Sequence, residues 1–164
     1  AGPAKQAWAC SPATINRYQA RISGPLLDRF DMHCSITEPS ITSPFETASE
    51  ATSSNAILKL VELARDLQAH RFKMHQITTN SEIPSHELTT FCGASSDAQN
   101  LLEDALRRQH ISQRGAARVL KISRTIADLE RSSKIEAVHL SEALQFRNGL
   151  TRKSLSQTAS FLAE

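Results

Sequence analysis

The sequence predicts a mainly α-helical protein. Apolar residues recur at helical spacing in four stretches, near 55–73, 95–108, 112–129 and 135–147. Glycine is sparse, with 5 residues, and aromatic residues make up only 5% of the chain. Hydrophobic residues make up 40% and charged residues 22% of the 164 positions, which is the balance of a globular protein. We expect part of a larger machine plus one small, complete helical domain.

Composition also limits the class of protein. The formal net charge of +2 is too small to demand a nucleic-acid partner. The three cysteines, Cys10, Cys34 and Cys92, are odd in number and widely spaced, which favours a reducing cytoplasm over a disulfide framework. No apolar run reaches membrane-spanning length and the first residues lack a signal-peptide pattern, so we expect no membrane partner.

The first part of the chain predicts a helix followed by a strand. Pro12 at a first helical position indicates a helix over 12–21, with Ser11 as its cap, and Gly24-Pro25 breaks the chain. From Met32 to Thr37 apolar and polar residues alternate as in a half-buried strand. The Ser-, Thr- and Pro-rich residues up to position 54 then predict a connector.

The second part predicts a series of helices. The first runs over 55–73 with Ser54 as its cap, and a shorter one over 84–91 is stopped by Gly93. A third begins at Ser95-Ser96-Asp97, and two more follow over 112–129 and 135–147. The apolar stripe of the first helix consists of Ile57, Leu60, Val61, Ala64 and Leu67. The face of the helix over 112–129 consists of Ala116, Val119, Leu120, Ile122, Ile126, Ala127 and Leu129.

Two stretches resemble a known family. Residues 23–31 read Ser-Gly-Pro-Leu-Leu-Asp-Arg-Phe-Asp, and this run resembles the AAA+ ATPases of the magnesium-chelatase (ChlI-like) type, most closely their ComM-like competence branch. Residues 124–130 and 135–147 are similar to the last two lid helices of the same ATPases. The resemblance implies an AAA+ C-terminal helical lid preceded by the last helix-strand portion of the α/β core. The implied division is 1–38 for the core segment, 39–54 for a linker, 55–148 for the lid and 149–164 for a tail.

The same resemblance implies roles for three arginines. Arg29 stands at the position of the arginine finger, which acts in trans on the nucleotide of a neighbouring subunit. Arg114 stands at the sensor-2 position, where it would reach the ATP phosphate, and Arg124 is a weaker candidate that instead packs or pairs structurally. A guanidinium suits both tasks because it is always charged and contacts two phosphate oxygens at once. Cys10 matches the last member of a cysteine cluster, but one thiol is no zinc site, and we expect no metal ligands.

The implied function is that of a ring-forming, ATP-dependent remodelling ATPase with a DNA remodelling or helicase task. ATP and Mg²⁺ would bind the intact protein, and its subunits would form a homo-oligomer, commonly a hexameric ring. The chain begins with Ala1 and contains no Gly-x-x-x-x-Gly-Lys-Ser/Thr loop. We therefore expect a C-terminal piece that alone hydrolyses no ATP and binds no cofactor tightly.

An alternative from another class is a helix-turn-helix module that reads DNA with residues 112–130. Ser123, Arg124 and Thr125 would then face bases, and the nearby Arg107, Arg108, Arg114 and Lys121 would meet phosphates. Against it, the supposed recognition helix continues as Ile-Ala-Asp-Leu-Glu, acidic and apolar where a groove-reading helix should be polar and basic. An unbroken helix over 112–130 would exclude this module. A third alternative, an all-α interaction module without a nucleotide, gives Arg29 no purpose.

Overall fold

The computed structural model describes residues 29–34, 52–108 and 111–148, together with the single positions 13, 14, 17, 21 and 26. Over these residues every regular element is a helix, which confirms the mainly α-helical fold. In chain order they are α3 (Ser54–Arg71), the 3-10 turns η1 (Asn80–Glu82) and η2 (Ser85–Glu87), α4 (Leu88–Phe91), α5 (Ser96–Arg108), α6 (Gln113–Leu129) and α7 (Ala137–Asn148). Most of the predicted helix over 12–21, most of the linker 39–54 and all of the tail 149–164 lie outside the described residues.

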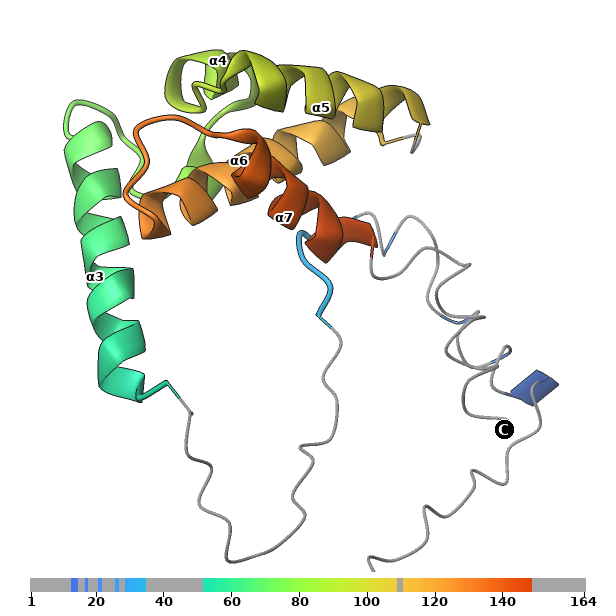
Figure 1. Ribbon diagram of the computed structural model, residues 1–164, viewed down its shortest axis with the longest axis horizontal. Coiled ribbons are helices and arrows are strands. Elements are labelled where there is room, and N and C mark those ends of the chain that lie inside the picture. The colour runs from blue at the N-terminus through green and yellow to red at the C-terminus, as the bar shows by residue number, and fades with distance from the viewer. Residues whose placement is uncertain are drawn as a thin grey trace, which may run out of the picture.

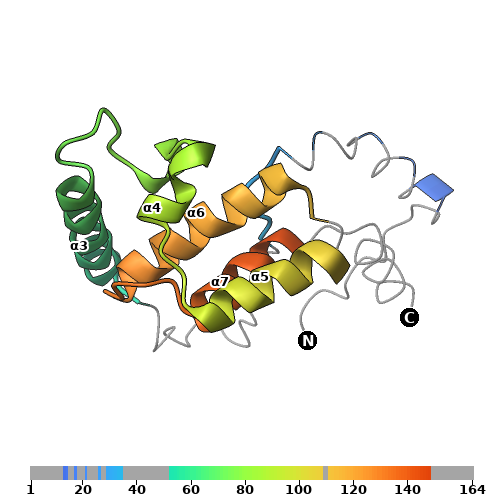
Figure 2. The same cartoon turned by 90° about the horizontal axis from the view of Figure 1, so that it is seen from above.

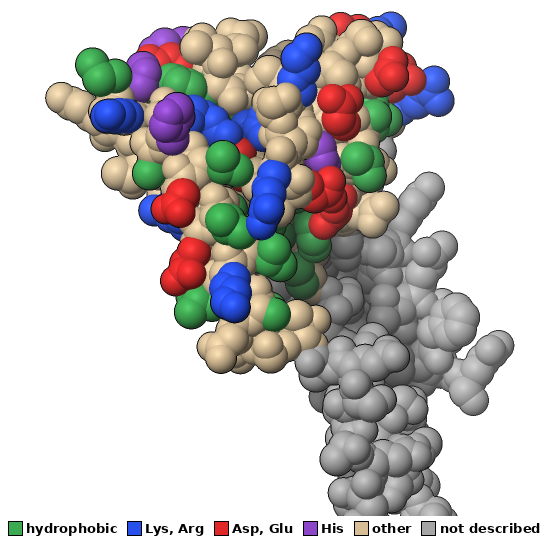
Figure 3. All heavy atoms as spheres, turned by 60° about the vertical axis from the view of Figure 1, so that its left-hand side comes forward, with side chains coloured by type: hydrophobic (Ala, Val, Ile, Leu, Met, Phe, Trp, Pro, Cys, Tyr) green, Lys and Arg blue, Asp and Glu red, His purple; other side chains and the backbone are tan. Residues whose placement is uncertain are grey.

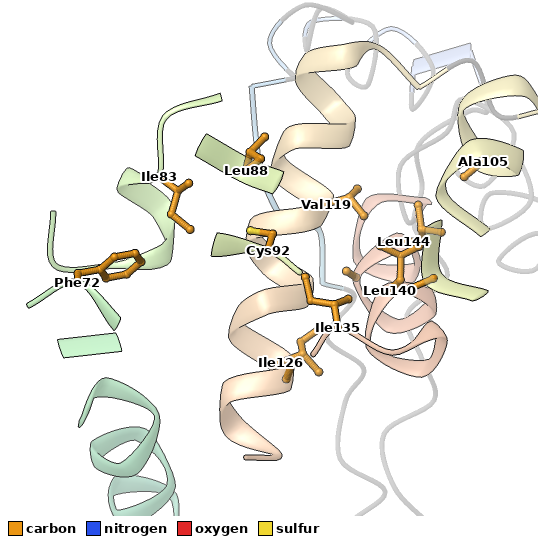
Figure 4. Close-up of a cluster of buried hydrophobic side chains, with 13 residues drawn as sticks. Phe72, Ile83, Leu88, Cys92, Ala105, Val119, Ile126, Ile135, Leu140 and Leu144 are labelled. Carbon is orange, nitrogen blue, oxygen red and sulfur yellow. The ribbon is translucent and has the colours of Figure 1, made fainter. Parts of the chain in front are cut away.

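Helix α6 is the centre of the described fold. Helices α5 and α7 lie side by side along it, α4 covers it from another side, and α3 crosses one of its ends (Figures 1 and 2). The core lies between α6 and α7, where Val119 and Leu140 are completely buried and Leu144 is nearly so (Figure 4). Phe72 and Ile83 enter the same core from the segments after α3 and η1. The apolar stripe of α6 thus forms the wall on which the other elements pack.

Two local devices fix the ends of these helices. Ser112 begins α6 by accepting a hydrogen bond at its Oγ from the backbone N–H of Gly115, at 3.0 Å. The segment before α7 is joined to the segment before α5 by two backbone bonds, from Ser95 N–H to the Ile135 carbonyl at 2.9 Å and from Ile135 N–H to the Gly93 carbonyl at 2.8 Å. These bonds hold the starts of α5 and α7 together.

Helix α3 differs from its prediction in two ways. Its cap is Ser53, whose Oγ accepts from Ala56 N–H at 3.3 Å, so the predicted cap Ser54 was wrong by one residue. The helix ends at Arg71 rather than Lys73, because Phe72 turns into the core. Its apolar stripe is also largely open: Ala64 is buried, but Ile57 is 50% exposed. Figure 3 shows this side of the molecule, with hydrophobic side chains visible between acidic and basic ones.

The predicted strand from Met32 is not found over the part that the structure describes. Residues 32–34 have no β partner, and residues 35–37 lie outside the described residues. A strand needs a neighbour to take its backbone hydrogen bonds. Here the N–H of His33 donates instead to the carbonyl of Phe146 on α7, at 2.7 Å. The segment 29–34 is therefore attached to the helical domain.

Candidate functional site

An open groove of about 590 Å³ runs along one face of α6. The helix supplies its floor, including Ala117 and Ile122. One wall comes from Asp31 and Met32, a second from Ser81 and Ser85 near the 3-10 turns, and a third from Glu142 and Phe146 of α7. The groove is therefore lined by residues from all three described ranges, 29–34, 52–108 and 111–148, and α6 supplies most of them.

Three cations line this groove from the same helix face. Arg114, Arg118 and Lys121 follow one another at spacings of four and three residues, so their side chains project on one side of α6. The Nζ of Lys121 donates to the Ser81 carbonyl at 2.9 Å, and the Nε of Arg118 lies 3.0 Å from Oδ1 of Asp31. Arg114 is exposed and has no hydrogen bond or ion pair with any described residue. Its guanidinium is thus available to an anion in the groove.

Arg29 lies just outside the groove. Its backbone N–H closes a turn by donating to the Leu26 carbonyl at 3.0 Å. Its side chain is exposed, and within the described ranges it forms no ion pair. The guanidinium is therefore open to a group from outside the chain, which is the condition that an arginine acting on a neighbour must meet.

Arg124, the weaker candidate, lies in the interior. It is 2% exposed, and its Nε donates to Oδ1 of Asp128 at 3.1 Å. Its two terminal nitrogens donate to the backbone carbonyls of Ser132 and Ser133, at 2.6 and 3.1 Å. These bonds hold the turn after α6. A nucleotide phosphate could reach this guanidinium only by displacing them.

Asp128 joins α3 to this interior network. Its carboxylate accepts from both terminal nitrogens of Arg71 at the end of α3, and from the side-chain amide of Asn80 at 2.8 Å. Burial acts to raise the pKa of Asp128, yet the hydrogen bonds from Arg71 and Asn80 and the charge of Arg124 outweigh it and hold the pKa below its usual range. Burial lowers the pKa of Arg124, and the Asp128 charge opposes that shift. The cluster is a structural joint in the last turns of α6, whereas Arg114 lies in the first turn.

The helix-turn-helix alternative is not supported. Helix α6 runs without a break from Gln113 to Leu129, through the position where that module needs its turn. Two of the three residues that would read bases, Ser123 and Arg124, are buried at 0% and 2% exposure. Arg107 and Arg108, which would meet phosphates, form ion pairs within α5 to Glu103 and Asp104.

Sequence reasoning missed several residues of this region. The spacing of Arg114, Arg118 and Lys121 was a signal in the sequence, because residues three and four apart share one face of a helix. That signal could have identified the cations that line the groove. The pairing of Arg118 with Asp31 had no such signal, because 87 positions separate them in the chain. The contact of Arg71 with Asp128, across 57 positions, had none either.

The described residues lack two kinds of feature. They contain no helix long and apolar enough to cross a membrane. They contain no group of three or more His, Cys, Asp or Glu side chains placed to hold a metal ion. Cys34 and Cys92 are free thiols, and burial raises the pKa of Cys92 to about 11. Cys10 lies outside the described residues.

Comparisons with known proteins identify the family. The sequence model described as magnesium chelatase, subunit ChlI C-terminal, matches residues 51–147, and one described as magnesium chelatase, subunit ChlI, matches residues 1–44. The chain is 36% identical over 138 residues to the uncharacterized protein YifB of Salmonella typhimurium, covering 84% of this chain and 26% of that protein. It is 35% identical over 137 residues to the competence protein ComM of Haemophilus influenzae, with the same two coverages of 84% and 26%.

An uncharacterized protein of Mycobacterium bovis is 32% identical over 144 residues, covering 88% of this chain and 28% of that protein. The chain therefore spans about a quarter of the length of the curated relatives it matches. The ChlI C-terminal match extends over more than half of the chain and coincides with the helical part described above. This protein belongs to the magnesium-chelatase ChlI family.

Proposed function

We propose that this chain is the lid and arginine-finger part of a ring-forming, ATP-dependent remodelling ATPase. In the intact protein ATP and Mg²⁺ would bind a nucleotide-binding core that precedes these residues, since the 164 positions include no Gly-x-x-x-x-Gly-Lys-Ser/Thr loop. Family membership supports the ATPase and the ring. The observation that carries the proposal is Arg114 in the first turn of α6, whose guanidinium lines an open groove and pairs with none of the described residues.

Arg114 acts as sensor 2 in this proposal. A cation in the first turn of a helix is mildly unfavourable unless an anion compensates it, and a nucleotide phosphate would be such an anion. A charge-assisted hydrogen bond contributes about 1.5–3 kcal/mol, so Arg114→Ala in the intact ATPase should lower kcat/KM for ATP by about 10- to 100-fold. Arg107→Ala removes a similar exposed charge from α5 and serves as the control. Equal activity of the two variants would refute the assignment.

Arg29 acts as the finger on the neighbouring subunit's nucleotide. The Arg29→Ala variant of the intact ATPase should bind ATP normally but lose about 10³- to 10⁵-fold in hydrolysis, the range found for such arginines elsewhere. Action in trans is tested by mixing these subunits with subunits that lack the phosphate-loop lysine but keep Arg29. Mixed rings should regain activity, because some interfaces then combine an intact core with an intact finger. Loss of nucleotide binding in Arg29→Ala would instead indicate a structural role.

The 164-residue chain by itself should not hydrolyse ATP or bind it tightly. It offers arginines to a phosphate, but its sequence contains no Gly-x-x-x-x-Gly-Lys-Ser/Thr loop whose backbone N–H groups could hold one. Release of phosphate by the purified chain is the direct measurement. Turnover above the rate of the Arg29→Ala, Arg114→Ala double variant would contradict the proposal.

For the client of the ring we propose DNA, because one relative carries the name of a competence protein. The test is ATP hydrolysis by the intact ring with and without single- and double-stranded DNA. Stimulation by DNA would support the proposal. Hydrolysis indifferent to DNA, but stimulated by a porphyrin and Mg²⁺, would favour the metal-insertion task of the classical chelatases.

A further inference from the structure

We infer that Arg118 is a positioning residue that ties the segment carrying Arg29 to the helix carrying Arg114. The arginine offered to a neighbour would then follow the movement of the lid in its own subunit. This inference rests on the proposed function. It adds a route by which the nucleotide state at one site reaches the next.

Two contacts hold the segment 29–34 against the helical domain. Oδ1 of Asp31 lies 3.0 Å from Nε of Arg118 on α6. The N–H of His33 donates to the Phe146 carbonyl on α7, at 2.7 Å. Met32, between these two anchors, lines the groove together with Asp31. Asp31 is therefore held by α6 and His33 by α7, and Arg29 precedes Asp31 by two positions.

The path between the two functional arginines is short. Arg114 and Arg118 are one helical turn apart, about 5.4 Å along the axis. The helix between them is fixed in the core by Ala116 and Val119, so both arginines move as one body. Beyond the ion pair, only Phe30 separates Asp31 from Arg29, a span of at most about 7 Å of chain. A displacement of α6 toward a phosphate would thus be passed to Arg29 through the contact between Arg118 and Asp31.

The burial of the pair argues that its role is geometric. Arg118 is 17% exposed and Asp31 is 60% exposed, so water screens the pair. Such a pair contributes no more than about 1 kcal/mol to folding. A displacement of a catalytic group by about 1 Å can nonetheless cost about 100-fold in rate. Loss of Arg118 should therefore cost little free energy of unfolding, but it should displace Arg29 enough to lower the rate of hydrolysis.

The first test measures the attachment in this chain and needs no ATPase activity. Amide exchange at His33, followed by NMR, reports opening of its bond to Phe146. Arg118→Gln and Asp31→Asn should each speed this exchange by about two- to fivefold, the worth of a screened ion pair. The Asp31 side chain is 60% exposed, so we expect its variant to fold as the wild type does. Arg107→Gln, which breaks an ion pair within α5, should leave His33 unchanged. Unchanged exchange in the Asp31 variant overturns the inference.

The second test uses the intact ring. Arg118→Gln should lower kcat by at least about tenfold, because Arg29 is no longer held in position for the neighbouring subunit's nucleotide. KM for ATP should stay within about twofold, since Arg114 is intact. The double variant Asp31→Arg, Arg118→Asp should restore most of kcat, because it re-forms the ion pair with the two charges exchanged. A parallel change in KM, or no rescue by the exchanged pair, refutes the inference. Full activity of Arg29→Ala would instead refute the proposed function, leaving the exchange result to stand alone.

Discussion

Helices α3 and α6 both carry apolar residues at helical spacing but have very different surroundings. Both carry apolar residues at spacings of three and four, and both have 17 or 18 residues. On α6 this stripe is the wall of the core, with Val119 and Ala127 fully buried. On α3 most of the stripe is open, and only Ala64 and Gln68 are buried. Periodicity identifies the face of a helix that favours burial, but it does not show whether a partner is present.

The two helices are accordingly held by different forces. Burial of apolar area holds α6, whereas α3 is attached chiefly at its last turn, where Arg71 meets Asp128 and Asn80. An apolar contact tolerates small shifts, but a buried ionic cluster requires fixed positions. The angle between α3 and α6 therefore depends on a few polar atoms.

The largest expected effect is that of Asp128→Ala, which breaks the attachment of α3. It leaves the buried guanidinium of Arg124 and the half-buried one of Arg71 without a carboxylate, which should cost about 3–5 kcal/mol of unfolding free energy. Urea unfolding followed by circular dichroism measures the change. Asp104→Ala, which removes an exposed carboxylate paired within α5, should change stability by less than about 0.5 kcal/mol. A cost below about 1 kcal/mol for Asp128→Ala would show that the cluster does not hold the joint.

A matched pair of isoleucines compares the two stripes directly. Ile126→Ala on α6 empties a buried site and should cost about 2–5 kcal/mol. Ile57→Ala on α3, where the side chain is half exposed, should cost less than about 0.5 kcal/mol. Thermal unfolding of both variants provides the measurement. A cost above about 1 kcal/mol for Ile57→Ala would mean that the α3 stripe is covered in solution, and the contrast between the helices would fail.

Acid should weaken the α3 joint before it weakens the apolar wall. The pKa of Asp128 in the folded protein lies below its ordinary value, so its stabilising contribution is complete above the unfolded-state pKa of about 3.9. The contribution is lost as the pH falls through the lower, folded-state pKa. The urea concentration at the unfolding midpoint, measured from pH 6 downward, should therefore begin to decrease in the wild type once the pH is below about 4. The Asp128→Asn variant should lack this loss of stability in acid. If its urea midpoints changed with pH as those of the wild type do, the loss could not be assigned to Asp128.

The smallest effect concerns the ends of the two helices. Arg131, just beyond α6, has a φ of 58°, a conformation that costs a non-glycine residue about 1 kcal/mol. Arg131→Gly should therefore stabilise the protein by up to about 1 kcal/mol, seen as a higher Tm. The chain leaves α3 at Phe72 with a φ of −100°, so Lys73→Gly, two positions after α3, should bring no such gain. Equal responses at both positions would mean that the Arg131 conformation is not strained.

Much of the local structure could be predicted from the sequence. The bounds of α5 and α6, those of α7 to within two residues, and the stop at Gly93 all depend on residues within one turn of each other. Such short-range signals act through the same backbone hydrogen bonds in any protein. The placement of Arg114 on the polar face of α6 belongs to this class, since helical spacing alone fixes it.

The packing of these elements was decided only in the tertiary structure. Arg124 and Arg114 lie on one helix, yet one is enclosed by Asp128 and the turn after α6 while the other faces a groove. Asp31 meets Arg118 across a long stretch of chain, and the α3 stripe remains open although its pattern predicts burial. Spacing along one helix is a property of neighbouring residues, whereas burial and pairing depend on which distant surface is brought against them. That is why the sequence determined the helices and the arginines they carry, and the fold alone determined which arginine remains available.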